Sequence, residues 1–284
     1  MTSPPETNAA QVELWNSEEA AHWVRDQDRY DRMLAPFAAA LLDALDLAPT
    51  ARVLDVGCGT GPTTCAVARA VPKGHARGLD ISRQMIEAAR QRATEAKLTN
   101  VTFDVGDAQT QSFGPETDIV MSRFGVMFFD DATAAFTNLR NALAPGGRVG
   151  FVCWQDLFVN EWMAVPGLAA AEHVPLPPFG APDEPGPFSF GDPDRVRSVL
   201  GDAGFVDVTV EPFETTILLG GGGSLDDATT FLRSTGMART LFADAEPDVV
   251  ERAIAAVRAA LEPFLTPEGV RIGAAAWIVG AGRG

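Results

Sequence analysis

The chain has 284 residues, enough for one α/β domain with an added lid or for two small domains. Its formal net charge of −16 would repel phosphate backbones and anionic lipid surfaces, and its arginines are scattered among acids without forming a basic patch. Together with the lack of a long uncharged apolar run, this excludes nucleic acid and membrane as expected partners.

The chain contains three cysteines, Cys58, Cys65 and Cys153. Their spacing is neither that of a disulfide scaffold nor that of a zinc site. The N-terminus is polar and lacks the basic and apolar stretches of a signal peptide. We therefore expect a cytoplasmic protein.

The first predicted elements are helices over residues 11–47. Aromatic and aliphatic residues recur there at helical intervals, among them Trp15, Trp23 and Tyr30. Ser17, followed by two glutamates, is a plausible helix start. Ordinary helix packing explains these aromatic residues at least as well as contact with a ligand does.

The stretch at residues 51–64, ARVLDVGCGTGPTT, organises the rest of the chain. Residues 53–56 are apolar apart from Asp55 and are long enough for a buried strand. They run into the glycine loop GCGTG, and Pro62 begins a helix that continues to residue 70. Alternate glycines let a ligand approach the backbone closely, and the helix presents free N–H groups over the loop. This pattern predicts a ligand-binding loop.

The glycine spacing narrows the choice of ligand. A dinucleotide fingerprint needs a third glycine where Pro62 stands, and no Gly-Lys-Ser/Thr follows to make a P-loop. The run VLDVGCGTG instead resembles the first motif of class I S-adenosylmethionine-dependent methyltransferases. The resemblance implies that this loop wraps the methionine part of the cofactor and that Asp55 helps to fix the ammonium group. The residues that it places there are Asp55, Gly57, Cys58 and Gly59.

A second strand over residues 76–82 contains Asp80, about twenty residues beyond the glycine loop. An acid at this point can accept hydrogen bonds from both ribose hydroxyls. It can also cap the next helix, and the two roles are compatible. Ile81 and Met85 are then apolar neighbours of the adenine ring.

The third strand, over residues 101–105, leads into a Gly-Asp turn. The resemblance places Asp107 against the adenine amino group, with the Ala108 backbone beside it. An Asp after Gly is also common in turns for purely structural reasons. The prediction for Asp107 therefore depends on its place after the two earlier motifs.

The fourth strand, over residues 118–123, ends where the methyl group should be presented, because ligands of open α/β sheets sit at the carboxyl ends of strands. Ser122 and Arg123, at this end, are assigned to the cofactor site. The Asn/Asp-Pro-Pro-Tyr/Phe motif of enzymes that methylate amino groups of DNA bases or glutamine is replaced by SRFG. Asp130 and Asp131 resemble the cap of the next helix, and we expect no catalytic metal.

A helix over residues 132–144 and a fifth strand over 148–154 complete the predicted core. We expect an α/β fold with a Rossmann-like seven-stranded methyltransferase sheet, its last strand antiparallel, and a helical lid. The later predicted elements are a helix ending at 203, a strand over 206–219, a glycine turn over 220–223, largely helical residues over 225–265 and a strand over 271–279. The predicted organisation is an N-terminal helical lid segment at 1–50, a cofactor-binding core at 51–154, and substrate-lid helices with the remaining core strands at 155–284.

Methyl transfer from a sulfonium is an in-line displacement in which the cofactor already carries the activation. The protein mainly supplies proximity, alignment and a dry pocket, so a base is needed only for an acceptor that must lose a proton. The candidate catalytic bases are His22 and His173, although a lone helical histidine is more often structural. The candidate acceptor contacts are apolar and aromatic: Trp15, Trp23, Tyr30, Phe124, Met127 and Trp162.

We expect an enzyme, monomeric or homodimeric, that uses S-adenosyl-L-methionine to methylate a small molecule such as a secondary metabolite or a quinone-like ring. The resemblance is closest to the ubiquinone/menaquinone-methyltransferase-like group. One open alternative is a non-catalytic S-adenosylmethionine-binding module. Another is a nicotinamide-dependent oxidoreductase, against which Pro62 argues. An arsenic methyltransferase is set aside, because the three cysteines fall on loop and core positions.

Overall fold

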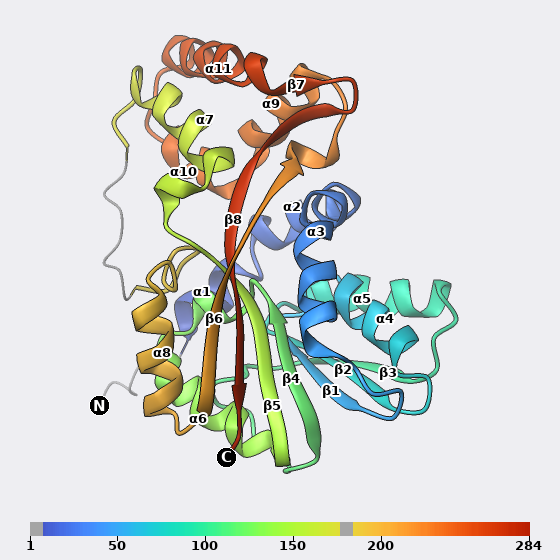
Figure 1. Cartoon of the computed structure of the whole chain (residues 1–284). Coiled ribbons are helices and arrows are strands. Elements are labelled where there is room, and N and C mark those ends of the chain that lie inside the picture. The colour runs from blue at the N-terminus through green and yellow to red at the C-terminus, as the bar shows by residue number, and fades with distance from the viewer. Residues whose placement is uncertain (1–7, 177–183) are drawn as a thin grey trace, which may run out of the picture.

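A computed structural model describes residues 8–176 and 184–284 of the chain (Figure 1). Within these residues, eight strands form a mixed sheet in the order β3-β2-β1-β4-β5-β8-β6, and the short β7 pairs with β8 off this path. Neighbouring strands from β3 to β5 are parallel, whereas β8 runs antiparallel to both β5 and β6. The strands are β1 Arg52–Val56, β2 His75–Asp80, β3 Val101–Val105, β4 Thr117–Arg123, β5 Leu143–Trp154, β6 Val206–Leu218, β7 Leu265–Thr266 and β8 Gly269–Gly282.

Helices cover both faces of this sheet and also its upper end. The helices are α1 Ala9–Leu14, α2 Glu18–Arg25, α3 Gln27–Leu45, α4 Pro62–Ala70, α5 Arg83–Glu95, α6 Ala132–Ala142, α7 Glu161–Ala171, α8 Pro193–Asp202, α9 Leu225–Ser234, α10 Gly236–Leu241 and α11 Pro247–Leu261. Short 3-10 turns are η1 Val126–Phe128, η2 Leu157–Val159, η3 Leu219–Gly221 and η4 Glu262–Phe264. Helices α3, α4 and α5 lie on one side of the sheet, and α6 and α8 on the other (Figure 1).

Local side chains determine where several helices begin. Asp131 caps α6, as expected, because its carboxylate accepts a hydrogen bond from the Ala134 N–H at 2.9 Å. Ser224 and Asp227 form a reciprocal capping box at the start of α9. The glycines before α9 therefore end in a helix cap and form a turn, as predicted, rather than a linker.

The C-terminal third differs most from the predicted elements. β8 extends beyond the predicted residues 271–279 at both ends. The prediction is too short because the outer residues are mostly small and do not carry the β-branched pattern that is typical of a strand. β6 and β8 pair over most of their length and continue above the rest of the sheet as a ribbon (Figure 1). This ribbon reaches helices α7, α9, α10 and α11, which we call the lid. The helix predicted to reach residue 144 ends at Ala142, since the chain enters β5 at Leu143.

One hydrophobic cluster runs from the sheet into the lid. It joins Phe37 of α3, Met121 of β4, Phe151 of β5 and Phe231 of α9, all of them fully buried. Helices α7, α9, α10 and α11 gather around the upper ends of β6 and β8 (Figure 1). The lid helices and the strands therefore share one core. In the described ranges, no helix is both long and apolar enough to cross a membrane.

Candidate cofactor and acceptor site

A cavity of about 530 Å³ lies at the carboxyl ends of β1, β2 and β4, below the lid helices. The glycine loop and the acids at the ends of the first three strands line one part of it, which we call the acidic half. Aromatic side chains from α2, α3, β5 and α7, and from the residues after α1 and β4, line the other part, which we call the aromatic half. Its place at the strand ends and its volume fit a ligand site of an open α/β sheet.

The glycine loop is held against the end of β4 by a contact between two backbones. Gly57 has a φ of +65°, and a Cβ built on it would lie 2.7 Å from the Cα of Gly125. A Cβ on Gly125 would in turn lie 2.7 Å from the carbonyl oxygen of Val56. Neither position can carry a side chain without moving the backbone. Gly125 is not among the predicted site residues, and its only signal in the sequence is a glycine two residues after the predicted end of the fourth strand.

Asp80 ties the glycine loop to β2. Its carboxylate accepts hydrogen bonds from the backbone N–H of Gly59 and of Ser82, each at 2.8 Å. Burial raises the pKa of Asp80, and the backbone N–H groups oppose that rise. Asp80 therefore binds the backbone just before α5 and also lines the cavity.

Asp55 and Arg123 bring opposite charges to the wall of the acidic half. Asp55 is 2% exposed, accepts a 2.6 Å hydrogen bond from the Thr64 hydroxyl, and has a pKa raised by burial to about 7. Burial lowers the pKa of Arg123, which is drawn electrostatically to Asp31 and Asp55. Among the described cavity-lining residues, Arg123 is the only basic one, against the acids Glu19, Asp31, Asp55, Asp80 and Asp107. The cavity thus favours a cationic ligand with one anionic group.

The first described residues close the cavity beside Asp107. The Asn8 amide donates to both oxygens of the Asp107 carboxylate at 2.9 Å. The Asn8 N–H donates to Asp130 at 2.6 Å, and the Asp130 N–H donates back to the Asn8 side chain at 2.9 Å. One turn along α1, Gln11 lines the cavity, and its buried Oε1 has no hydrogen-bond partner in the described part of the chain.

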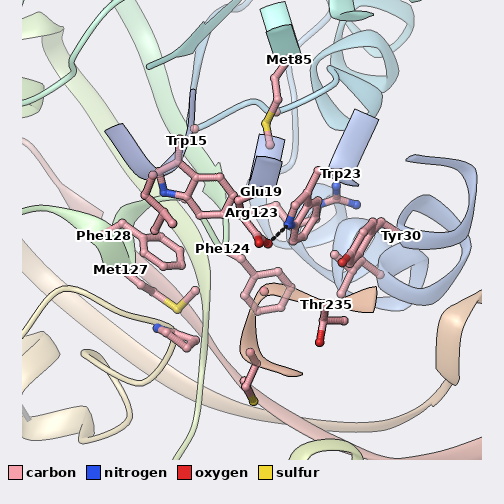
Figure 2. A pocket seen from close by; sticks show the side chains of 18 of the residues that line it. Trp15, Glu19, Trp23, Tyr30, Met85, Arg123, Phe124, Met127, Phe128 and Thr235 are labelled. Atoms are coloured by element: carbon pink, nitrogen blue, oxygen red, sulfur yellow. Dashed lines mark hydrogen bonds between the residues drawn. The ribbon is translucent and has the colours of Figure 1, made fainter. Parts of the chain in front are cut away.

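Stacked aromatic pairs form the wall of the aromatic half, and Figure 2 shows one of them, Trp23 with Tyr30. Trp23 stacks on Tyr30 with ring centroids 3.7 Å apart and planes 7° from parallel. Phe124 stacks on Trp154 at 4.0 Å and 15°. Their neighbours are set edge-on or tilted, as rings in a packed interior prefer. The aromatic wall consists of Trp15, Trp23, Tyr30, Phe124, Phe128, Trp154 and Trp162.

Glu19 links α2 to α10 across the aromatic half. Its carboxylate accepts a 3.0 Å hydrogen bond from the Trp23 indole (Figure 2) and pairs with Arg239 of α10. Asp31 is also paired, with Arg92 at 2.7 Å. Both acids of this region therefore already have partners.

Three residues predicted for the site do not line the cavity, contrary to the prediction. Ser122 is buried behind the loop, where its hydroxyl donates to the Val56 carbonyl at 2.7 Å. His22 is 1% exposed and does not line the cavity, while His173 lies exposed just after α7. Neither histidine is placed to act on a bound acceptor. Helical spacing alone did not show which face of α2, or which side of α7, would meet the cavity.

The remaining predicted site residues all line the cavity. From the cofactor set these are Asp55, Gly57, Cys58, Gly59, Asp80, Ile81, Met85, Asp107, Ala108 and Arg123. From the acceptor set they are Trp15, Trp23, Tyr30, Phe124, Met127 and Trp162. Across residues 8–176 and 184–284, no cluster of three or more His, Cys, Asp or Glu side chains could hold a metal ion.

Similarity to known proteins shows the family of this chain. A family model described as a methyltransferase domain matches residues 53–147. Demethylmenaquinone methyltransferase of Geobacillus sp. (strain WCH70) is 30% identical over 178 residues, which cover 57% of this chain and 74% of that protein. The chain belongs to the S-adenosylmethionine-dependent methyltransferases. The family, the Rossmann-like fold and the cofactor predicted from the sequence are thereby confirmed, and a nicotinamide cofactor is not favoured.

Other matches to this methyltransferase are partial or distant. Aklanonic acid methyltransferase DauC of Streptomyces sp. (strain C5) is 38% identical over 128 residues, which cover 43% of this chain but only 58% of that protein. Phosphoethanolamine N-methyltransferase 2 of Haemonchus contortus, solved with phosphomonomethylethanolamine and S-adenosylhomocysteine, has a TM-score of 0.57 at 17% identity. That alignment covers 95% of this chain and 58% of the other, and it shows a shared fold.

Proposed function

We propose that this protein transfers a methyl group from S-adenosyl-L-methionine to a small, largely apolar molecule that contains a planar ring system. The observation that carries the proposal is the continuity of one cavity, in which the acidic half meets the aromatic half at the end of β4. The names of two relatives point the same way, since aklanonic acid and demethylmenaquinone are small molecules.

The acidic half fits the cofactor. The backbone contact between Gly57 and Gly125 keeps side chains out of the loop that would cradle it. Asp80 would accept from the ribose hydroxyls, because each of its oxygens already bound to one N–H retains a further lone pair. The other residues proposed to hold the cofactor are Asp55 for the ammonium group, Arg123 for the carboxylate, and Asp107 with Gln11 for the adenine end.

When bound, S-adenosylmethionine supplies a methyl group activated by its sulfonium. The aromatic wall would hold the acceptor in line with that group and exclude water. Such alignment can account for about 7–11 kcal/mol of a barrier. No described histidine or lysine lines the cavity, and Glu19 and Asp31 are already paired. The geometry therefore suits an acceptor whose nucleophilic atom carries its lone pair without help from a protein base.

The test is an assay for S-adenosylhomocysteine release with phenols, hydroxyquinones and amines as acceptors. We expect turnover with at least one of these classes and its loss in Asp80→Ala, which should bind the cofactor weakly. Asp194→Ala, an exposed change on α8, is the matched control and should retain activity. A wild type that binds the cofactor tightly but methylates none of these acceptors would favour the non-catalytic alternative. A protein that binds neither S-adenosylmethionine nor its product would contradict the proposal.

We also propose a cytoplasmic protein that is monomeric or homodimeric and has no nucleic-acid partner. The net charge of −16 supports the last point, and three free, buried cysteines fit a reducing compartment. Light scattering during size-exclusion chromatography would give the oligomeric state, and a particle larger than a dimer would contradict this part of the proposal.

A further inference from the structure

We infer that the hydroxyl of Tyr30 donates a hydrogen bond to an oxygen atom of the acceptor and that His22 holds it in this role. This inference rests on the proposed function and narrows its substrate class to planar apolar molecules that carry a carbonyl, phenol or enol oxygen. His22 thereby acts through Tyr30 as a positioning residue, not as a base.

The Tyr30 ring has little freedom to move. It is 7% exposed, stacks on Trp23 at 3.7 Å, and meets the edge of Phe231 at 5.1 Å. Its hydroxyl lies 2.9 Å from Nε2 of His22, which is its only hydrogen-bond partner in the described part of the chain. Tyr30 stands beside Trp23 in the wall of the cavity (Figure 2).

The surroundings of His22 determine which partner donates in this bond. A guanidinium nitrogen of Arg25 lies 2.7 Å from Nδ1 of His22, and a guanidinium can only donate. Nδ1 must then offer its lone pair, because a proton there would point at the cation. The Asp26 carboxylate, 3.2 Å from the same nitrogen, also pairs with Arg25. Burial lowers the pKa of His22 and so favours the neutral ring. From the Arg25 donor at Nδ1 we assign the ring proton to Nε2.

The Nε2–H of His22 therefore donates to the oxygen of Tyr30, and the phenolic proton is left without an acceptor among the described residues. Burial, together with the nearby Glu19 and Asp26 carboxylates, raises the pKa of Tyr30 and keeps that proton in place at neutral pH. Tyr30 lines the cavity and is 7% exposed, and a buried donor is costly to leave unpaired. An acceptor oxygen on the ligand would pair with it.

Two other polar groups near this position are already engaged. Glu19 accepts from Trp23 and pairs with Arg239. The Thr235 hydroxyl donates to the Leu232 carbonyl at 2.7 Å. Tyr30 thus offers a hydrogen-bond donor to an otherwise apolar ligand in this half of the cavity.

The experiment uses the full chain saturated with S-adenosylhomocysteine and compares 1-naphthol with naphthalene, a pair that differs by one oxygen. Ligand-observed NMR titration gives the dissociation constants. We expect Tyr30→Phe to weaken 1-naphthol roughly three- to tenfold, the loss of one hydrogen bond between uncharged groups, and to leave naphthalene unchanged. His22→Leu should have the same effect, while His22→Gln, which retains an N–H near the position of Nε2, should restore the affinity for 1-naphthol.

Equal affinity of wild type and Tyr30→Phe for 1-naphthol would overturn the inference. A parallel loss for both probes would also overturn it, because that pattern indicates packing alone, and so would a wild type that does not bind 1-naphthol. Calorimetric titration with S-adenosylhomocysteine should give one affinity for all variants, which shows that they fold. A wild type that fails this last titration would count against the proposed function itself, an outcome distinct from an unchanged Tyr30→Phe.

Discussion

At the scale of single residues, the site depends on groups that are unfavourable in the cofactor-free fold. Asp55 is a carboxyl that burial holds at a pKa of about 7, where an ordinary aspartate has 3.8. Gly57 and Gly125 leave the backbone without side-chain cover at the strand ends. A cationic ligand against the loop would stabilise the ionised Asp55 carboxylate and would cover this backbone.

The raised pKa of Asp55 predicts proton release on cofactor binding. At about pH 6 the carboxyl is mostly protonated in the free protein, and a cationic ammonium group favours the ionised form. Affinity for S-adenosylmethionine should therefore rise between about pH 6 and pH 8, with protons released to the buffer. Calorimetry in buffers of different ionisation enthalpy measures this release. Asp55→Asn should bind more weakly and without this pH dependence, whereas an equal slope in that variant would contradict the assignment.

The same pKa shift predicts the pH dependence of stability. A carboxyl whose folded pKa lies above its unfolded pKa stabilises the fold at low pH, and this contribution is lost as the pH rises through the folded value. The cofactor-free wild type should therefore lose stability, relative to Asp55→Asn, as the pH rises from about 4 to above 7. Urea unfolding at several pH values measures the difference. A difference that does not change with pH would show that Asp55 is already ionised in the fold.

The contact between the two glycine backbones predicts that Gly125→Ala is costly. The added Cβ would lie 2.7 Å from the Val56 carbonyl oxygen and 2.8 Å from the Cα of Gly57. We expect a loss of about 1–3 kcal/mol in unfolding free energy and a clear loss of cofactor affinity. Gly201→Ala, in α8 with open space around the new Cβ, is the control. It should retain affinity and gain stability from helix propensity.

At the scale of elements, α1 is held in place by Asn8. Its amide bonds the Asp107 carboxylate, and its backbone and side chain bond Asp130. A helix of six residues has little stability of its own. These few bonds therefore help to hold α1 over the part of the cavity beside Asp107, where we propose that the adenine ring binds.

Asn8→Ala should loosen α1. Hydrogen bonds to charged groups contribute about 1.5–3 kcal/mol each, so amide exchange over residues 9–14 should accelerate roughly tenfold or more. Exchange followed by mass spectrometry measures this change. Asn141→Ala, an exposed asparagine on α6, should leave exchange in α1 unchanged. Unchanged exchange in Asn8→Ala would mean that other contacts hold the helix.

The sequence predicts the acidic half of this site much better than the aromatic half. Asp55, Asp80 and Asp107 each lie at or near the end of one of three successive strands, so local order places them together. The aromatic half depends on contacts between distant segments, such as the pairing of Glu19 with Arg239. His22 lies on the inner face of α2 because Tyr30 and Arg25 occupy its ring nitrogens, which helical periodicity does not specify.

At the scale of the whole molecule, the lid and the sheet share one hydrophobic cluster and the long β6–β8 ribbon. A shared core of this kind favours unfolding as one unit, whereas separate cores would unfold separately. Because the acidic cavity adjoins this shared core, a ligand that binds there should stabilise the whole chain against unfolding.

Calorimetric unfolding should therefore show a single transition that the cofactor product moves as a whole. At a hundredfold excess of S-adenosylhomocysteine over its dissociation constant, the stabilisation should be about 2.7 kcal/mol. Asp80→Ala should show little of this shift at the same ligand concentration. Two transitions, of which only one responds to the ligand, would indicate that the lid and the cofactor core unfold independently.

The aromatic wall also gives the protein an optical property. The chain has five tryptophans, and four of them line the cavity: Trp15, Trp23, Trp154 and Trp162. The fifth, Trp277, lies on β8, and its indole N–H donates to the Gly191 carbonyl. Intrinsic emission therefore reports mostly on the interior of the cavity. A coloured or quenching acceptor that enters it would dim most of the fluorescence of the molecule, so an unlabelled sample could be screened against compound collections by light alone.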